Sequence, residues 1–118
     1  MPKAALTLRI DFGPRRLGPG KVALLECIAR EGSIAAAARS MKMSYRRAWE
    51  LVEDINTTFG APVLSTATGG SRGGGARLTP LGADVVALFR ALERDAARAA
   101  SPHLQALAGR LASAPIPE

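Results

Sequence analysis

The chain has 118 residues and a mass of 12.3 kDa, the size of one domain. Its single cysteine and single histidine exclude a disulfide framework and a zinc ribbon. Sixteen Lys and Arg residues against ten Asp and Glu residues give a net charge of +6, which favours nucleic acid as a partner without requiring it. No pattern of paired acids or of a nucleophile with its base indicates an enzyme, so we expect no catalysis, cofactor or metal. No apolar run approaches a membrane span, and the N-terminus does not resemble a signal peptide, so we expect a bacterial cytoplasmic protein.

The N-terminal quarter combines a strand pattern with a helix pattern. Residues Ala5–Phe12 alternate apolar and polar side chains, which predicts a strand that is half buried on one face. Glycines and prolines between residues 13 and 20 predict turns, and a helix follows from about Pro19 to Glu31, with Gly32 placed to end it. The apolar face of this helix is predicted to consist of Val22, Leu25, Ile28 and Ala29.

Two further helices follow, joined by a very short turn. Ser33 is a good N-cap for a helix over Ile34–Met41, and Ser44 for a longer helix that reaches Phe59. The first contains four consecutive alanines, which allow close crossing of a neighbour. The core stripe of the second is predicted to be Ala48, Val52, Ile55 and Phe59. This arrangement is typical of a helix-turn-helix, whose second helix enters the major groove with its N-terminal residues at the base edges.

Basic residues gather around the start of the second helix. Between residues 39 and 47 there are four cations and no acid, namely Arg39, Lys42, Arg46 and Arg47. The alternative is an ordinary helical hairpin with a solvated basic face, and the turn lacks the glycine often found in helix-turn-helix motifs. We expect Tyr45 to reach a phosphate or a base edge, and Trp49 to pack as core against the base of the next hairpin.

A glycine-rich segment, residues 68–75, lies between two strand candidates, Val63–Ala67 and Ala76–Leu78. A nucleotide-binding loop is disfavoured because neither Gly-Lys-[Ser/Thr] nor GxGxxG spacing is present. A flexible linker would explain the glycines but not the flanking strands. A hairpin tip, or wing, that touches the DNA backbone explains both features. The predicted DNA contacts are therefore Ser33, Lys42, Ser44, Tyr45, Arg46, Arg47, Arg72, Gly73, Gly74 and Arg77.

Thr79-Pro80 is a strong start for a last helix. We predict that it extends to about Ala100, where Ser101-Pro102 breaks it, so that residues 1–100 form the DNA-binding domain and residues 101–118 a weakly helical or disordered tail. Its apolar face is wide enough to pack inside on one side and against a second copy on the other. The predicted dimer contacts are Leu81, Val85, Leu88 and Leu92. The predicted fold is mainly α with a small β-wing: a winged helix-turn-helix with a long C-terminal dimerisation helix.

Two segments carry a family resemblance. SYRRAW (residues 44–49) and TGGSRGGGARLT (residues 68–79) closely resemble the DNA-binding domain of ModE-type molybdate-responsive regulators, and GSIAAAA (residues 32–38) is similar to the LysR-type helix-turn-helix. The resemblance implies a homodimeric transcription factor on a palindromic operator, read by residues 44–47 and touched by Arg72.

The resemblance also bears on ligand sensing. Regulators of this type sense molybdate in a separate C-terminal domain, and this chain ends soon after its last helix. We therefore expect that it does not sense molybdate itself and that a separate partner protein could supply ligand sensing. The competing hypothesis is a protein-interaction module that uses the same scaffold without reading DNA.

Overall fold

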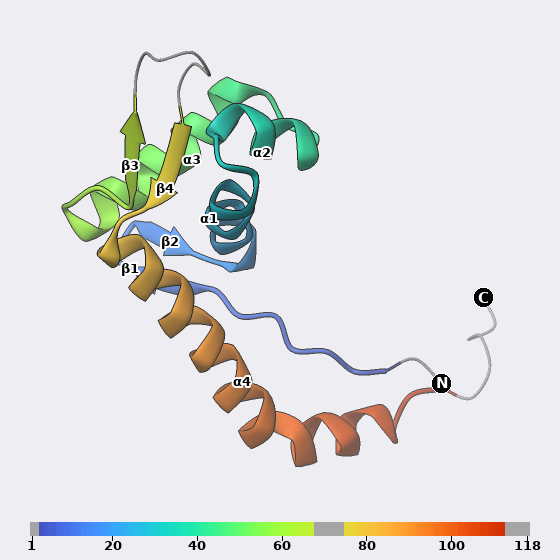
Figure 1. Ribbon diagram of the computed structural model, residues 1–118. Coiled ribbons are helices and arrows are strands. Elements are labelled where there is room, and N and C mark those ends of the chain that lie inside the picture. Colours follow the sequence, from blue (N-terminus) through green and yellow to red (C-terminus); the bar gives the residue numbers. More distant parts are fainter. Residues whose placement is uncertain (1–2, 68–74, 113–118) are drawn as a thin grey trace.

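The computed structural model describes residues 3–67 and 75–112 (Figure 1). The elements follow in the order β1 (Ile10–Phe12), β2 (Arg15–Leu17), α1 (Pro19–Glu31), α2 (Ile34–Ser40), α3 (Tyr45–Phe59), β3 (Leu64–Ala67), β4 (Gly75–Leu78) and α4 (Pro80–Ala108). Two separate antiparallel hairpins form, β1 with β2 and β3 with β4. This architecture confirms the predicted winged helix-turn-helix. The predicted contacts Arg72, Gly73 and Gly74 lie outside the described residues.

Helix boundaries follow from local capping chemistry. The side-chain oxygens of Ser33, Ser44 and Thr79 each accept a hydrogen bond from the backbone N–H three residues later, over 3.0 to 3.1 Å. Gly32 and Gly60 end α1 and α3 in the left-handed conformation, with φ of 87° and 71°. The predicted starts and ends of α1 and α3 are confirmed, and α2 ends one residue before its predicted end.

The core surrounds α1, which packs against α2, α3, α4 and β4. Because α1 has neighbours on most sides, its buried side chains extend around the helix and include Leu24 and Cys27 as well as the predicted Val22, Leu25 and Ile28. Ala29, predicted on the core face, is exposed in the last turn of α1. In α3 the predicted stripe is buried at Ala48, Val52 and Ile55, and Phe59 at its end is half-buried.

The predicted strand over Ala5–Phe12 is wrong in its first half. Only Ile10–Phe12 forms a strand, because its partner β2 is three residues long and follows a tight turn with Gly13 at φ 62°. Residues 3–9 find no strand partner within the described chain, and Figure 1 shows them extended alongside α4. The second strand of this hairpin, where only turns were expected, is an element that the sequence did not predict.

The predicted break at Ser101-Pro102 is also wrong, because α4 continues to Ala108. Proline lacks an N–H and its ring crowds the carbonyl four residues earlier, so inside an established helix it produces a kink. Figure 1 shows α4 bending toward its C-terminal end. Residues 101–108 therefore extend the helix instead of starting a tail. None of the helices in the described ranges combines the length and apolar character that crossing a membrane requires.

Candidate nucleic-acid interface

The turn between α2 and α3 fixes where α3 begins. Lys42 adopts a left-handed conformation with φ 59°, and its N–H donates to the carbonyl of Arg39 over 3.2 Å. The N–H of Met43 donates to the carbonyl of Ala38 over 2.9 Å, which completes a Schellman motif. Met43 packs against the core, as the residue at this position of the motif often does. Lys42 thus takes the conformation that the missing glycine would have supplied.

The start of α3 points its polar side chains away from the core. Ala48 is fully buried, and helical spacing places Arg46 and Glu50 on the opposite face. The Arg46 side chain is 86% exposed, and its Nε lies 3.7 Å from a carboxylate oxygen of Glu50. An ion pair this exposed is weak, so the guanidinium remains available to another partner.

Of the seven predicted contact residues that the structure describes, it brings five together at this end of α3. Lys42, Ser44, Tyr45, Arg46 and Arg47 are all exposed, as is Arg39 at the end of α2. Arg77, also exposed, lies on β4 opposite Ser65. In Figure 1 the β3–β4 hairpin and the α2–α3 pair both lie at the end of the molecule away from the C-terminal part of α4. Ser33 differs, since it is half-buried and its hydroxyl caps α2.

Trp49 was expected in the core and is instead 47% exposed. It lies one turn after Tyr45, which is 55% exposed, and both line a shallow depression together with Arg46 and Glu50. Position 49 follows Ala48 by roughly 100° around the helix, which turns it away from the buried stripe. The spacing of the stripe was therefore the signal that could have identified Trp49 as a surface residue.

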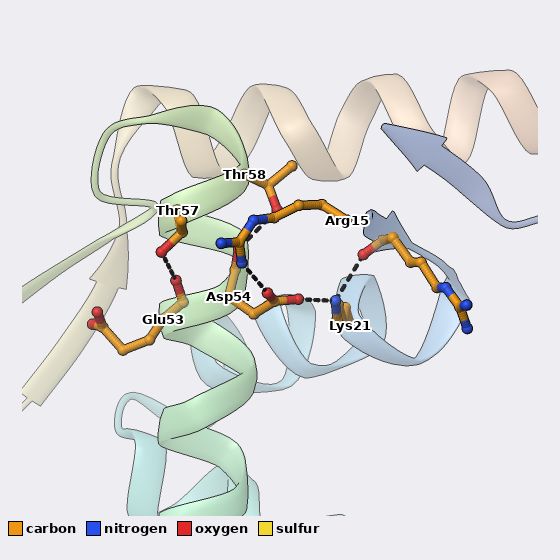
Figure 2. A network of polar contacts seen from close by, with 7 residues as sticks. Arg15, Lys21, Glu53, Asp54, Thr57 and Thr58 are labelled. Atoms are coloured by element: carbon orange, nitrogen blue, oxygen red, sulfur yellow. Dashed lines mark hydrogen bonds and ion pairs between the residues drawn. The ribbon is translucent and has the colours of Figure 1, made fainter. Parts of the chain in front are cut away.

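An ion-pair network anchors the C-terminal half of α3 (Figure 2). The Asp54 carboxylate accepts hydrogen bonds from Lys21 Nζ in α1 and from Arg15 Nη1 in β2, the latter over 2.7 Å. Lys21 also donates to the carbonyl of Arg16 over 2.7 Å. The hydrogen bond from Lys21, followed by that from Arg15, holds the pKa of Asp54 below its usual range although partial burial opposes the shift. These contacts fix α3 at one end and leave its basic start projecting.

Two contacts fix α4 to the rest of the domain. Arg90 donates from Nη2 and Nε to the two carboxylate oxygens of Glu26 over 2.6 and 3.1 Å, and from Nη1 to Glu93 over 2.7 Å. The forked hydrogen bond lowers the pKa of Glu26 and raises that of Arg90. At the start of α4, Gly82 approaches the backbone so closely that a Cβ would lie 2.1 Å from the carbonyl oxygen of Val63.

The predicted dimer stripe divides between the core and the surface. Val85 is buried in the core and Leu81 is half-buried against it, whereas Leu88 and Leu92 are 70% and 43% exposed. These two leucines border an apolar groove of about 170 Å³ between α4, the β1–β2 hairpin and the end of α3. The groove is lined by Ile10, Phe12, Leu17, Phe59, Val85, Leu88, Phe89 and Leu92. None of these lining residues is charged, and the described ranges contain no cluster of His, Cys, Asp and Glu that could hold a metal ion.

The sequence of this chain is similar to those of several curated proteins. Over 83 residues the chain is 47% identical to the molybdenum-pterin-binding protein MopB of Rhodobacter capsulatus, covering 70% of this chain and 31% of that protein. It is 40% identical over 90 residues to the molybdenum transport protein ModE of Azotobacter vinelandii, covering 76% of this chain and 33% of that protein. The chain thus spans about a third of the length of these curated relatives, and the predicted ModE-type resemblance is confirmed over that part.

A solved structure shares the fold. The full-length LTTR LysG from Corynebacterium glutamicum with bound effector Arg superimposes with a TM-score of 0.55 at 24% identity, covering 85% of this chain and 31% of that one. The pattern of the bacterial regulatory helix-turn-helix proteins of the lysR family matches residues 20–83, which is more than half of the chain and includes α2, α3 and all of α1 except its first residue, Pro19. The chain therefore belongs to the lysR family of bacterial regulatory helix-turn-helix proteins.

Proposed function

We propose that this chain is a transcriptional regulator that binds double-stranded DNA sequence-specifically, as a homodimer on a palindromic operator. The observation that carries the proposal is the start of α3, where exposed basic side chains follow the Ser44 cap while the opposite face is buried. A helix held in this way can enter the major groove with its first turn at the base edges.

The contact residues take different roles in this proposal. Arg46 and Arg47 lie in the first turn of α3, where a guanidinium can form a fork with a guanine edge. Lys42 in the turn and Arg77 on the β3–β4 hairpin are assigned to phosphates, which fix orientation but carry no sequence information. Ser33 supports the site by capping α2.

The dimer is assigned to the apolar groove beside α4. Leu88, Leu92 and Phe12 are exposed around it, and an apolar surface of this kind is matched by a second copy better than by a phosphate backbone. A two-fold axis there would present two α3 helices to half-sites about one helical turn, roughly 34 Å, apart.

Ligand sensing is assigned to a separate partner protein and not to residues 3–67 and 75–112. No polar or charged side chain among them is buried, so they offer no enclosed set of donors for a tetrahedral oxyanion. Since relatives are named for molybdenum, we propose that the operators lie at genes for molybdenum handling, and that molybdate leaves the melting temperature of residues 1–118 unchanged.

Selection of bound sequences from random duplexes tests the proposal most directly. A palindromic consensus is expected. Recovery of no preferred sequence, with little duplex affinity even at low salt, would contradict it and favour the protein-interaction alternative.

A matched pair of variants then separates base reading from phosphate contact. Arg46→Ala should lower discrimination between operator and random duplex by about 1–3 kcal/mol. Arg77→Ala should weaken binding to both duplexes alike and reduce the salt slope by about one. Equal losses on both duplexes for both variants would contradict the assignment of α3 as the reading helix.

A further inference from the structure

Two aromatic side chains are exposed at the same end of α3 as the basic cluster. The chain has one Trp, one Tyr and three Phe, and both Trp49 and Tyr45 lie about half exposed in the first two turns of α3. Helical side chains lean toward the N-terminus, so the ring of Trp49 extends back toward Tyr45. The two rings therefore contribute to one apolar surface, the depression that Arg46 and Glu50 complete.

The charges around this depression indicate which part of DNA it faces. The Glu50 carboxylate and the Arg46 guanidinium both lie on its border and form an exposed ion pair, so the depression offers no net positive charge to a phosphate. Base edges in the major groove carry no net charge, and thymine alone among the bases presents a methyl group there. An apolar surface whose bordering charges are paired fits a methyl-bearing base edge better than the backbone.

We propose that Tyr45 and Trp49 determine specificity by contacting the 5-methyl groups of thymines in the major groove. This inference rests on the proposed function and adds Trp49 to the reading surface of α3. The apolar groove beside α4 is a separate surface bordered by Leu88 and Leu92, whereas the depression on α3 is lined by Arg46, one of the exposed basic residues at the start of that helix. Continuity with the basic cluster favours DNA over a protein as the occupant.

Replacing thymine by deoxyuridine removes only the 5-methyl group and tests the contact directly. In the selected operator, each thymine is replaced singly and the wild-type affinity is measured. We expect at least one position per half-site at which affinity falls about fourfold, the change that corresponds to losing burial of one methyl-sized group. Trp49→Ala or Tyr45→Ala should bind the thymine and uracil forms of that position equally.

Arg47→Ala serves as the matched control on the same helix. It should bind more weakly overall but keep the fourfold preference for thymine, since it removes a charge and no apolar surface. Circular dichroism measures whether the variants fold. We expect that they do, because the side chains of Tyr45, Arg47 and Trp49 are exposed. Tight operator binding with no uracil-sensitive position, or a preference that survives in both aromatic variants, would overturn this inference and leave the proposed function intact. A chain with no preferred duplex would overturn both.

The fluorescence of Trp49 provides an independent measurement because it is the only tryptophan of the chain. Binding of operator should shift its emission to the blue and reduce quenching by acrylamide. Unchanged quenching in the saturated complex would overturn the inference, since the ring would then remain in water and be free for a protein partner.

Discussion

Helices α3 and α4 each bury one face in the same core, but what they expose differs in kind. At its start α3 exposes guanidinium groups and aromatic rings, as at Arg46 and Trp49, whereas α4 exposes aliphatic side chains, as at Leu88 and Leu92. Phosphates and base edges match the first set by charge, hydrogen bonding and methyl contact. The side chains exposed on α4 are instead matched by the same apolar surface of a second copy of the chain. Under the proposed function, the contrast assigns DNA to α3 and a second chain to α4.

The two helices are also held in different ways. Charged side chains from α1 and β2 converge on Asp54 and anchor α3 (Figure 2), while α4 adds to its ion pair with Glu26 a close backbone approach at Gly82. Surface ion pairs tolerate small displacements, and backbone contact does not. Substitutions in α4 should therefore have the larger effect on stability.

The largest effect is expected for Gly82→Ala. The new Cβ would lie 2.1 Å from the Val63 carbonyl oxygen, and neither backbone can move without displacing the core. We expect a loss of about 3 kcal/mol or more in the free energy of unfolding, measured with urea. The control is Gly20→Ala in α1, where nothing lies within 4 Å of the new Cβ and stability should be unchanged or rise by up to about 1 kcal/mol. Similar values for both variants would contradict the close approach.

The next effect concerns the exposed aliphatic side chains of α4. Leu88→Glu or Leu92→Glu places like charges across the proposed two-fold interface, and we expect dissociation of the dimer with a loss of operator affinity of about 2 kcal/mol. Ala87→Glu, on an exposed side of the same helix turned away from the groove, should leave both unchanged. Sedimentation at micromolar concentration and circular dichroism measure assembly and folding. A folded wild-type monomer that binds its operator tightly would rule out the dimer.

A smaller effect is expected at the anchor of α3. Asp54→Asn keeps the shape but loses the charge that Lys21 and Arg15 contact, and since the Asp54 side chain is 34% exposed we expect a cost of about 1 kcal/mol. Glu50→Gln removes the exposed partner of Arg46 and should cost close to nothing. Urea unfolding of both variants at neutral pH measures the difference, and equal costs would show that the network does not anchor α3.

The same anchor predicts a pH dependence. The pKa of Asp54 is lower in the folded state than its ordinary value of about 4, so its contribution is fully present above that pH and is lost as the pH falls through the lowered value. Asp54→Asn should remove this part of the acid sensitivity. An unchanged acid profile in the variant would place the lowered pKa elsewhere.

Local chemistry explains what the sequence predicts well. Caps and left-handed glycines act within one turn of the chain, so Ser33, Ser44 and Gly60 mark their boundaries without knowledge of the rest. The basic start of α3 is predictable for the same reason, because helical spacing alone separates its residues from the buried stripe.

Contacts between distant segments explain what the sequence missed. The carboxylate of Asp54 meets Lys21, which is 33 residues away, and nothing in either local pattern indicates the pairing. The strand expected to begin at Ala5 begins only at Ile10, because its partner β2 is three residues long. The helix expected to stop before Pro102 continues with a kink. Val85 and Leu88 belong to one apolar stripe, yet the packing of α1 and the β1–β2 hairpin decides that one is buried and the other exposed.

The smallest expected effect lies in the turn that connects the two halves of the helix-turn-helix. Lys42 has φ 59°, a conformation that costs a residue with a Cβ about 1–2 kcal/mol, while glycine adopts it freely but loses more entropy on folding. Lys42→Gly and Lys42→Ala both remove the charge, so both should weaken duplex binding equally and lower the salt slope by about one. Their stabilities should differ, with the glycine variant about 1 kcal/mol more stable than the alanine variant in urea unfolding. Because the pair shares the lost charge and differs only in the Cβ, equal stabilities would show that this turn is not left-handed in solution, and unequal affinities would show that the conformation of the turn, as well as its charge, positions α3 on DNA.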